Sequence, residues 1–196
     1  MRTSAPTARG AAAGWRTAHV VMRAGWSVRV YDAHLVPRSG PVILAPNHSG
    51  FLDAPLLMGT SPRPIHCLTK KEMFRAPLGW FLRSIGQIPI DRSRPDRTAL
   101  IRCAAVLEAG RVLVVYPEGR RGSGDFTDVR PGLAWFALRS GAPVVPVIVM
   151  GTRLPVAQHR IVLLGGGYVT LHAYAGLMRR AGRAVRRGEV QGVVIS

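Results

Sequence analysis

Short runs of consecutive apolar residues alternate along this chain with segments whose apolar residues recur every three or four positions. Continuous apolar runs are typical of strands buried on both faces of a sheet, and the three-to-four spacing is typical of amphipathic helices. The predicted strands are residues 28–31, 42–45, 65–69, 86–92, 112–116, 143–150, 160–164 and 168–174. The predicted helices are residues 15–26, 51–58, 70–84 (kinked or restarted at Pro77), 96–109 and 132–140. The alternation predicts an α/β fold, with a largely parallel mixed sheet flanked by helices and a short amphipathic helix in front of it.

A single domain accounts for most of the chain, since 196 residues suffice for one hydrophobic core. We expect residues 1–14 to be a frayed, disordered tail and residues 15–175 to form the domain. Residues 176–196 are rich in Arg and Gly, and we expect a truncated or divergent end that is either a helix lying on anionic lipid or a solvated tail. No apolar run approaches the 18 residues of a membrane-spanning helix.

The predicted helix over residues 15–26 has two interpretations. Trp15 and Trp26 lie on its apolar face, and arginines flank it. Tryptophans between arginines suit a membrane interface. The same apolar face equally suits packing on the domain, and the sequence leaves both interpretations open.

Basic residues outnumber acidic ones, with 27 Lys and Arg against 10 Asp and Glu and a formal net charge of +17. This excess favours an anionic partner, such as a membrane surface, a phosphorylated substrate, an acidic carrier protein or a nucleic acid. Nucleic-acid binding stands as a hypothesis from a separate class. However, the aromatic residues are not interleaved with the basic stretches as base stacking requires, so no nucleic-acid partner is expected.

Polar clusters directly follow three of the predicted strands. His48 and Asp53 come after the second strand, Asp91 and Arg92 close the fourth, and residues 118–121 follow the fifth. Because ligands collect beyond the carboxyl ends of parallel strands, we expect these clusters to converge on one edge of the sheet. The two cysteines have no metal-type spacing and are predicted to be buried, and no metal site is expected.

His48 and Asp53 are candidates for acid–base chemistry. On one continuous helix, residues five apart point about 140° away from each other. Their side chains meet only if His48 lies in the turn before a helix and Asp53 lies in its first turns. A histidine oriented by a carboxylate can remove a proton from a hydroxyl near neutral pH.

Four blocks resemble, in order and spacing, those of the glycerolipid acyltransferases, the 1-acylglycerol-3-phosphate acyltransferase family. Residues 47–53 (N-H-S-G-F-L-D) resemble its N-H-x-x-x-x-D block, and residues 86–92 (G-Q-I-P-I-D-R) are similar to its second block. Residues 116–123 (Y-P-E-G-R-R-G-S) resemble the third, usually F-P-E-G-T-R-S, and residues 144–149 (V-V-P-V-I-V) resemble the fourth. The resemblance covers roughly residues 28–152.

The resemblance implies transfer of an acyl group from acyl-CoA or acyl-carrier protein to the free hydroxyl of lysophosphatidate, without a metal or other cofactor. His48 would be the general base, and Asp53 would orient it and stabilise its charged form. The residues assigned to acceptor binding are Asn47, Asp91, Arg92, Glu118, Gly119, Arg120, Arg121 and Arg130. Donor or lipid contact is assigned to Lys70, Lys71 and Pro146. Such an enzyme is expected in the cytoplasm, peripheral on the inner face of the cell membrane, with the anionic membrane surface as a partner.

Several assignments have a structural alternative. The alternative for the pair of Asp91 and Arg92 is a surface ion pair. The alternative for Glu118 is an acid at a helix start, and that for the two lysines is a solvated face. Arg120 stands where the third block usually has Thr or Ser, and residues 153–196 match the family poorly. Two alternatives therefore stay open: an acyltransferase acting on another lysolipid or a glycolipid, and a non-catalytic lipid-binding relative.

Overall fold

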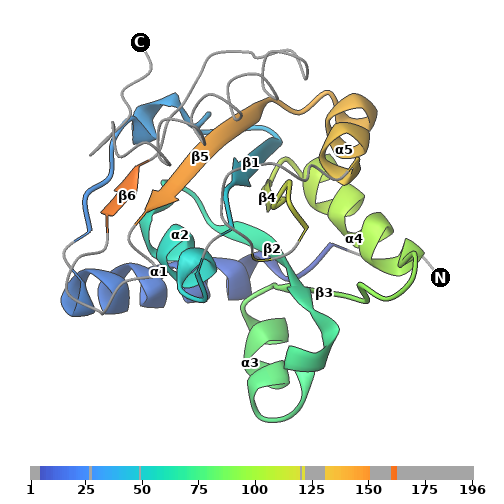
Figure 1. Cartoon of the computed structure of the whole chain (residues 1–196), viewed down its shortest axis with the longest axis horizontal. Helices are drawn as coiled ribbons and strands as arrows, with labels where there is room; N and C mark the ends of the chain where they lie inside the picture. The colour runs from blue at the N-terminus through green and yellow to red at the C-terminus, as the bar shows by residue number, and fades with distance from the viewer. Residues whose placement is uncertain are drawn as a thin grey trace.

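A computed structural model of the chain describes residues 5–26, 28–48, 50–119, 121, 131–150 and 160–162. Within these residues the strands form a six-stranded sheet in the order β3-β2-β4-β1-β5-β6 (Figure 1). The strands are β1 (Val42–Pro46), β2 (Ile65–Lys70), β3 (Ile88–Ile90), β4 (Val112–Val114), β5 (Val144–Met150) and β6 (Arg160–Val162). The pairs among β1 to β5 are parallel, and β6 is antiparallel to β5 at one edge. The largely parallel α/β sheet that the sequence predicts is confirmed.

Helices cover both faces of this sheet (Figure 1). They are α1 (Ala8–Gly25), α2 (Asp53–Thr60), α3 (Leu78–Ser84), α4 (Arg97–Glu108) and α5 (Gly132–Ser140), with the short 3₁₀ helices η1 (Ala33–Leu35) and η2 (Lys71–Phe74). Helices α1 and α2 contribute to one hydrophobic cluster, and α4 and α5 to the other. The central strand β1 supplies Val42 and Leu44 to the first cluster and Ile43 and Ala45 to the second. All four side chains are 0% exposed, which explains the continuous apolar run in the sequence.

The strand predicted over residues 28–31 is wrong. These residues are irregular and lead into η1. Val28 and Val30 are partly buried against the α1–α2 cluster, so their apolar side chains cover the core without pairing to a strand. The strand predicted over residues 168–174 lies outside the described residues.

Helix α1 begins at Ala8, seven residues earlier than the sequence predicts, so residues 8–14 of the expected tail are helical. The side chain of Thr7 caps the helix by accepting a hydrogen bond from the Gly10 backbone N–H. Gly10 and Gly14 lie one turn apart, where an added Cβ would collide with Ser84 and Ile85. The small residues that resemble a tail in the sequence are therefore the surface through which α1 approaches the domain.

The apolar face of α1 packs on the domain. Trp15 Nε1 donates a hydrogen bond of 2.8 Å to the Ser61 carbonyl, and Met22 is buried against α2. Gly59 of α2 lies against α1 so closely that an added Cβ would be 2.5 Å from the Ala18 carbonyl oxygen. Of the two interpretations of this helix, packing on the domain fits the positions of Trp15 and Trp26.

The close approach of α1 and α2 predicts that Gly59→Ala lowers the free energy of unfolding by about 1–3 kcal/mol, because the new methyl group pushes α1 away. Gly25→Ala is the matched control, since nothing lies within 4 Å of a Cβ added at Gly25. Urea unfolding followed by circular dichroism measures both variants. A Gly59→Ala variant as stable as the Gly25→Ala variant would contradict this packing.

Candidate active site

The segments that follow β1, β3 and β4 meet at the carboxyl edge of the sheet. His48 lies two residues after β1, and its ring stacks on the Tyr116 ring, two residues after β4, with centroids 4.1 Å apart and planes inclined by 30°. Arg92, two residues after β3, is electrostatically coupled to Arg121, which follows the β4 segment. The convergence of the three clusters predicted from the sequence is confirmed.

His48 and Asp53 form the hydrogen bond that their spacing predicts. His48 lies in the turn before α2 and Asp53 is the first residue of α2, with 2.9 Å between His48 Nδ1 and Asp53 Oδ2. The Asp53 side chain is 0% exposed and that of His48 is 12% exposed. Since an ionised carboxylate only accepts hydrogen bonds, this contact assigns a proton to Nδ1, and in the neutral imidazole Nε2 is then the acceptor.

The turn around Asp53 holds its carboxylate in place. The backbone N–H of Gly50 donates to the same Oδ2 over 2.8 Å, so the loop closes on the carboxylate that it positions. The amino end of α2 adds a favourable dipole for a negative charge. Pro55 stands in the first turn of α2, where a missing N–H costs no helical hydrogen bond.

Tyr116 is a residue of the site that the sequence reasoning missed. It opens the third block, so its position beside Pro117 and Glu118 was the available signal. Burial raises the pKa of Tyr116 well above its usual value, and the nearby Cys67 and Asp53 raise it further. The ring therefore stays uncharged and fixes the plane of His48 from one side.

Two guanidinium groups lie at the same edge of the sheet as His48 and Asp53. Both Arg92 and Arg121 are exposed. Partial burial and the charge of Arg121 lower the pKa of Arg92, while Glu72 of η2 raises it. The Arg121 guanidinium also lies 5.7 Å from the centre of the Phe51 ring, three residues after His48. Two neighbouring positive charges that repel each other are a ready site for an anion of two charges.

Asp91 is engaged in organising the loop that presents Arg92. Its carboxylate accepts hydrogen bonds from Lys71 Nζ at 2.6 Å, from the N–H and Oγ of Ser93, and from Arg94 Nε at 3.1 Å. These bonds, that from Lys71 first, hold the pKa of Asp91 far below its usual value. The ion pair suggested as the alternative for Asp91 exists, but with Lys71 and Arg94 instead of Arg92. Direct contact of Asp91 with substrate is therefore not supported.

Two other residues assigned to substrates bind the protein itself. The Asn47 side chain donates to the Val149 carbonyl over 3.0 Å and accepts from the Val149 N–H over 2.7 Å, which ties β1 to β5. Pro146 is buried within β5 opposite Ala45. Neither the acceptor role of Asn47 nor the donor contact of Pro146 is supported by this geometry.

The structure describes some of the remaining assigned residues and not others. Glu118 is 5% exposed, and Gly119 adopts a φ of +68° that closes the turn after β4. Lys70 is exposed at the end of β2. Arg120, Arg130 and the basic segment 176–196 lie outside the described residues. Within the described part of the chain, no group of three His, Cys, Asp or Glu side chains is arranged to hold a metal ion.

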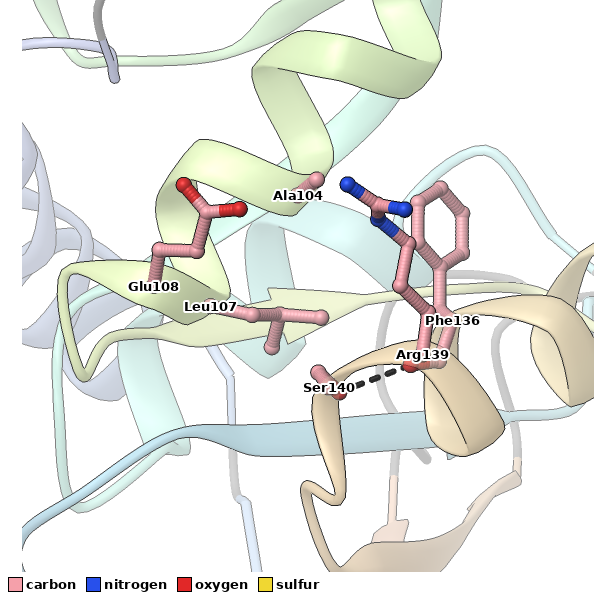
Figure 2. Close-up of a pocket in the computed structure, with 6 residues that line it drawn as sticks. All are labelled: Ala104, Leu107, Glu108, Phe136, Arg139 and Ser140. Carbon is pink, nitrogen blue, oxygen red and sulfur yellow. Dashed lines mark hydrogen bonds between the residues drawn. The ribbon is translucent and has the colours of Figure 1, made fainter.

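A pocket of about 260 Å³ lies elsewhere, between α4 and α5 (Figure 2). Glu108 and Ser140 line it at the carboxyl ends of these helices, just before β4 and β5 begin. That position is the amino edge of the sheet, opposite His48. The pocket is therefore not part of the site described above.

Known proteins resemble this chain in sequence and in fold. It is 31% identical over 134 residues to the 1-acyl-sn-glycerol-3-phosphate acyltransferase of Bacillus subtilis, covering 67% of each chain. It is 26% identical over 169 residues to a chloroplastic 1-acyl-sn-glycerol-3-phosphate acyltransferase of Arabidopsis thaliana, covering 79% of this chain but only 47% of that relative.

The fold resembles the crystal structure of the 1-acyl-sn-glycerophosphate acyltransferase from Thermotoga maritima, with a TM-score of 0.69 at 20% identity over 95% of this chain and 81% of that one. The family model named Acyltransferase matches residues 27–150, more than half of the chain and the stretch that carries the site. The chain belongs to the acyltransferase family.

Proposed function

We propose that this protein transfers an acyl group from the thioester of acyl-CoA or acyl-carrier protein to the free hydroxyl of lysophosphatidate. The observation that carries the proposal is the hydrogen bond between His48 and the buried Asp53, at the same edge of the sheet as the neighbouring guanidinium groups of Arg92 and Arg121. A positioned base beside a site for a dianion suits an acceptor whose hydroxyl lies near a phosphate. The names of the relatives from Bacillus subtilis and Arabidopsis thaliana support the same acceptor.

The reaction follows from the tautomer of His48. Nε2 takes the proton of the acceptor hydroxyl as its oxygen attacks the thioester carbonyl, and the buried charge of Asp53 stabilises the imidazolium that forms. The tetrahedral intermediate collapses to the new ester and releases the thiolate. The imidazolium then returns its proton to the thiolate, so that the products are the acylated acceptor and a free thiol. Tyr116 keeps the imidazole plane fixed through these steps.

The arginines favour a phosphate monoester over other lysolipid headgroups. A monoester phosphate carries close to two negative charges, which neutralise the repulsion between Arg92 and Arg121. A headgroup that also carries a cation adds a third positive charge to this region. Since both candidate donors are present in the cytoplasm, the proposal includes action at the inner face of the cell membrane.

Replacing the base tests the proposal directly. His48→Ala is expected to lower kcat/KM by about 10²–10⁴-fold with either donor, because proton removal is lost. His34→Ala is the control, since His34 is exposed in η1 before β1 begins. Released thiol measures the rate, and a thiol reagent is suitable because Cys67 and Cys103 are both buried. A His48→Ala variant within tenfold of the control would contradict the assignment of the base.

Removing one guanidinium tests the acceptor. Arg92→Gln and Arg121→Gln are each expected to raise the KM for lysophosphatidate by about 10–100-fold, because a charge-assisted phosphate contact is lost. The KM for monoacylglycerol, an acceptor without a phosphate, is expected to change little in the same variants. Arg139→Gln is the matched control, since it removes the same charge at the opposite edge of the sheet. Equal effects on both acceptors would contradict phosphate binding by these arginines.

A further inference from the structure

Helix α3 turns its largest apolar side chains to solvent. Trp80 is 71% exposed, Phe81 54% and Leu78 45%. Leu78 and Phe81 are three residues apart and lie on the same side of the helix, and Trp80 is turned about 100° from Phe81. Adjacent exposed residues of this size mark an interaction surface more often than a chance exposure.

The backbone of α3 explains why this face is uncovered. Gly79 points inward, where an added Cβ would collide with the backbone of Phe74 in η2. The other end of α3 meets α1 near Gly10. Held by these two contacts, α3 projects from the lower side of the molecule in the view of Figure 1, and its outer face has no cover among the described residues.

Three exposed cations lie in the same chain segment as the aromatic residues. Lys70 precedes η2, Arg75 follows it, and Arg83 lies in the last turn of α3 with its guanidinium 5.2 Å from the centre of the Phe74 ring. Glu72 is the one acidic residue between β2 and β3, and its charge acts on Arg92. We define the α3 surface as Leu78, Trp80 and Phe81 together with Lys70, Arg75 and Arg83.

The α3 surface is joined to the candidate active site. Helix η2 leaves β2 at the carboxyl edge of the sheet, where Lys71 bonds to Asp91 at the end of β3. Glu72 of the same helix faces Arg92. The short helix η2, held by the bond from Lys71 to Asp91, therefore connects the α3 surface to the proposed phosphate site.

We propose that the α3 surface binds an anionic lipid bilayer, with Trp80 and Phe81 inserted at the interface and the three cations at the headgroups. Aromatic side chains with adjacent cations favour the boundary between headgroups and acyl chains. A protein groove would match the apolar residues alone, whereas an anionic bilayer matches the exposed cations of the same segment as well. One part of this inference rests on the proposed function: the bilayer also supplies the lysophosphatidate that enters beside Arg92.

Vesicle flotation tests the surface. The vesicles are phosphatidylcholine alone, or with about one third phosphatidylglycerol to supply negative charge. Trp80→Ala/Phe81→Ala is expected to weaken binding to the anionic vesicles by about tenfold or more, because the inserted apolar area is lost. The matched control is Trp135→Ala/Leu138→Ala, which removes exposed apolar residues from α5. Unchanged binding by the α3 variant, or an equal loss in the control, overturns the proposal.

Fluorescence identifies the inserted residue. With brominated lipids in the anionic vesicles, quenching of tryptophan emission is expected to be lost in Trp80→Phe and kept in Trp135→Phe. Size-exclusion chromatography with light scattering tests whether a second copy of this chain covers the α3 surface instead of a bilayer. A dimer that the Trp80→Ala/Phe81→Ala variant disrupts, without quenching by the lipids, overturns the proposal.

Activity assays separate this inference from the proposed function. The ratio of rates on vesicle-embedded and dissolved short-chain lysophosphatidate is expected to fall in the α3 variant and stay constant in the α5 control. If the wild-type protein binds vesicles through Trp80 but acylates neither acceptor, the proposed function fails and the bilayer surface stands. If both variants acylate the vesicle-embedded acceptor like the wild type, the bilayer surface fails.

Discussion

The hydrogen bond between His48 Nδ1 and the fully buried Asp53 is the contact on which the carboxyl edge of this domain depends. The same carboxylate oxygen accepts the Gly50 N–H and stands at the first turn of α2. The bond therefore links the end of β1 to the start of α2. With Tyr116 stacked on the imidazole, the segment after β4 joins the same structure.

The rest of the architecture keeps this contact in register. β1 is the central strand, buried on both faces, and the Asn47 amide ties its end to Val149 of β5. Helix α2 is held from outside by α1, through the close contact of Gly59 with Ala18. A single charged group buried without a counterion in such a core would be costly. The hydrogen bonds from the His48 imidazole and the Gly50 N–H offset the cost of burying the Asp53 carboxylate.

The sequence predicted the parts of the molecule that local pattern determines. Continuous apolar runs identified β1, β4 and β5, and the spacing of His48 and Asp53 already required a turn followed by a helix start if the two side chains were to meet. Local pattern could not identify partners that are distant in sequence. The Asn47 amide binds Val149, 102 residues away, so the N-H-x-x-x-x-D block alone could not show that this side chain bonds to β5.

Two errors have the same physical origin. Residues 28–31 have the apolar side chains of a strand, but they cover the core beside η1 without a partner strand. Residues 1–14 were expected to be a tail because they are rich in Ala, Thr and Arg without an apolar stretch, yet residues 8–14 are helical. Contact with Ser84 and Ile85 requires small residues at Gly10 and Gly14. In both places packing against a distant element outweighed local preference. Tyr116 was missed for the same reason, since its stacking partner belongs to a neighbouring strand segment.

The most direct test of the account is the steady-state rate of Asp53→Asn with lysophosphatidate and acyl-CoA. The amide keeps the size of the side chain and an oxygen for the Gly50 N–H, but it removes the charge that stabilises the His48 imidazolium. The expected result is a fall in kcat of about 10²–10⁴-fold with a nearly unchanged KM for lysophosphatidate. A kcat within a few-fold of the wild type would contradict the role of Asp53 and, with it, that of the oriented base.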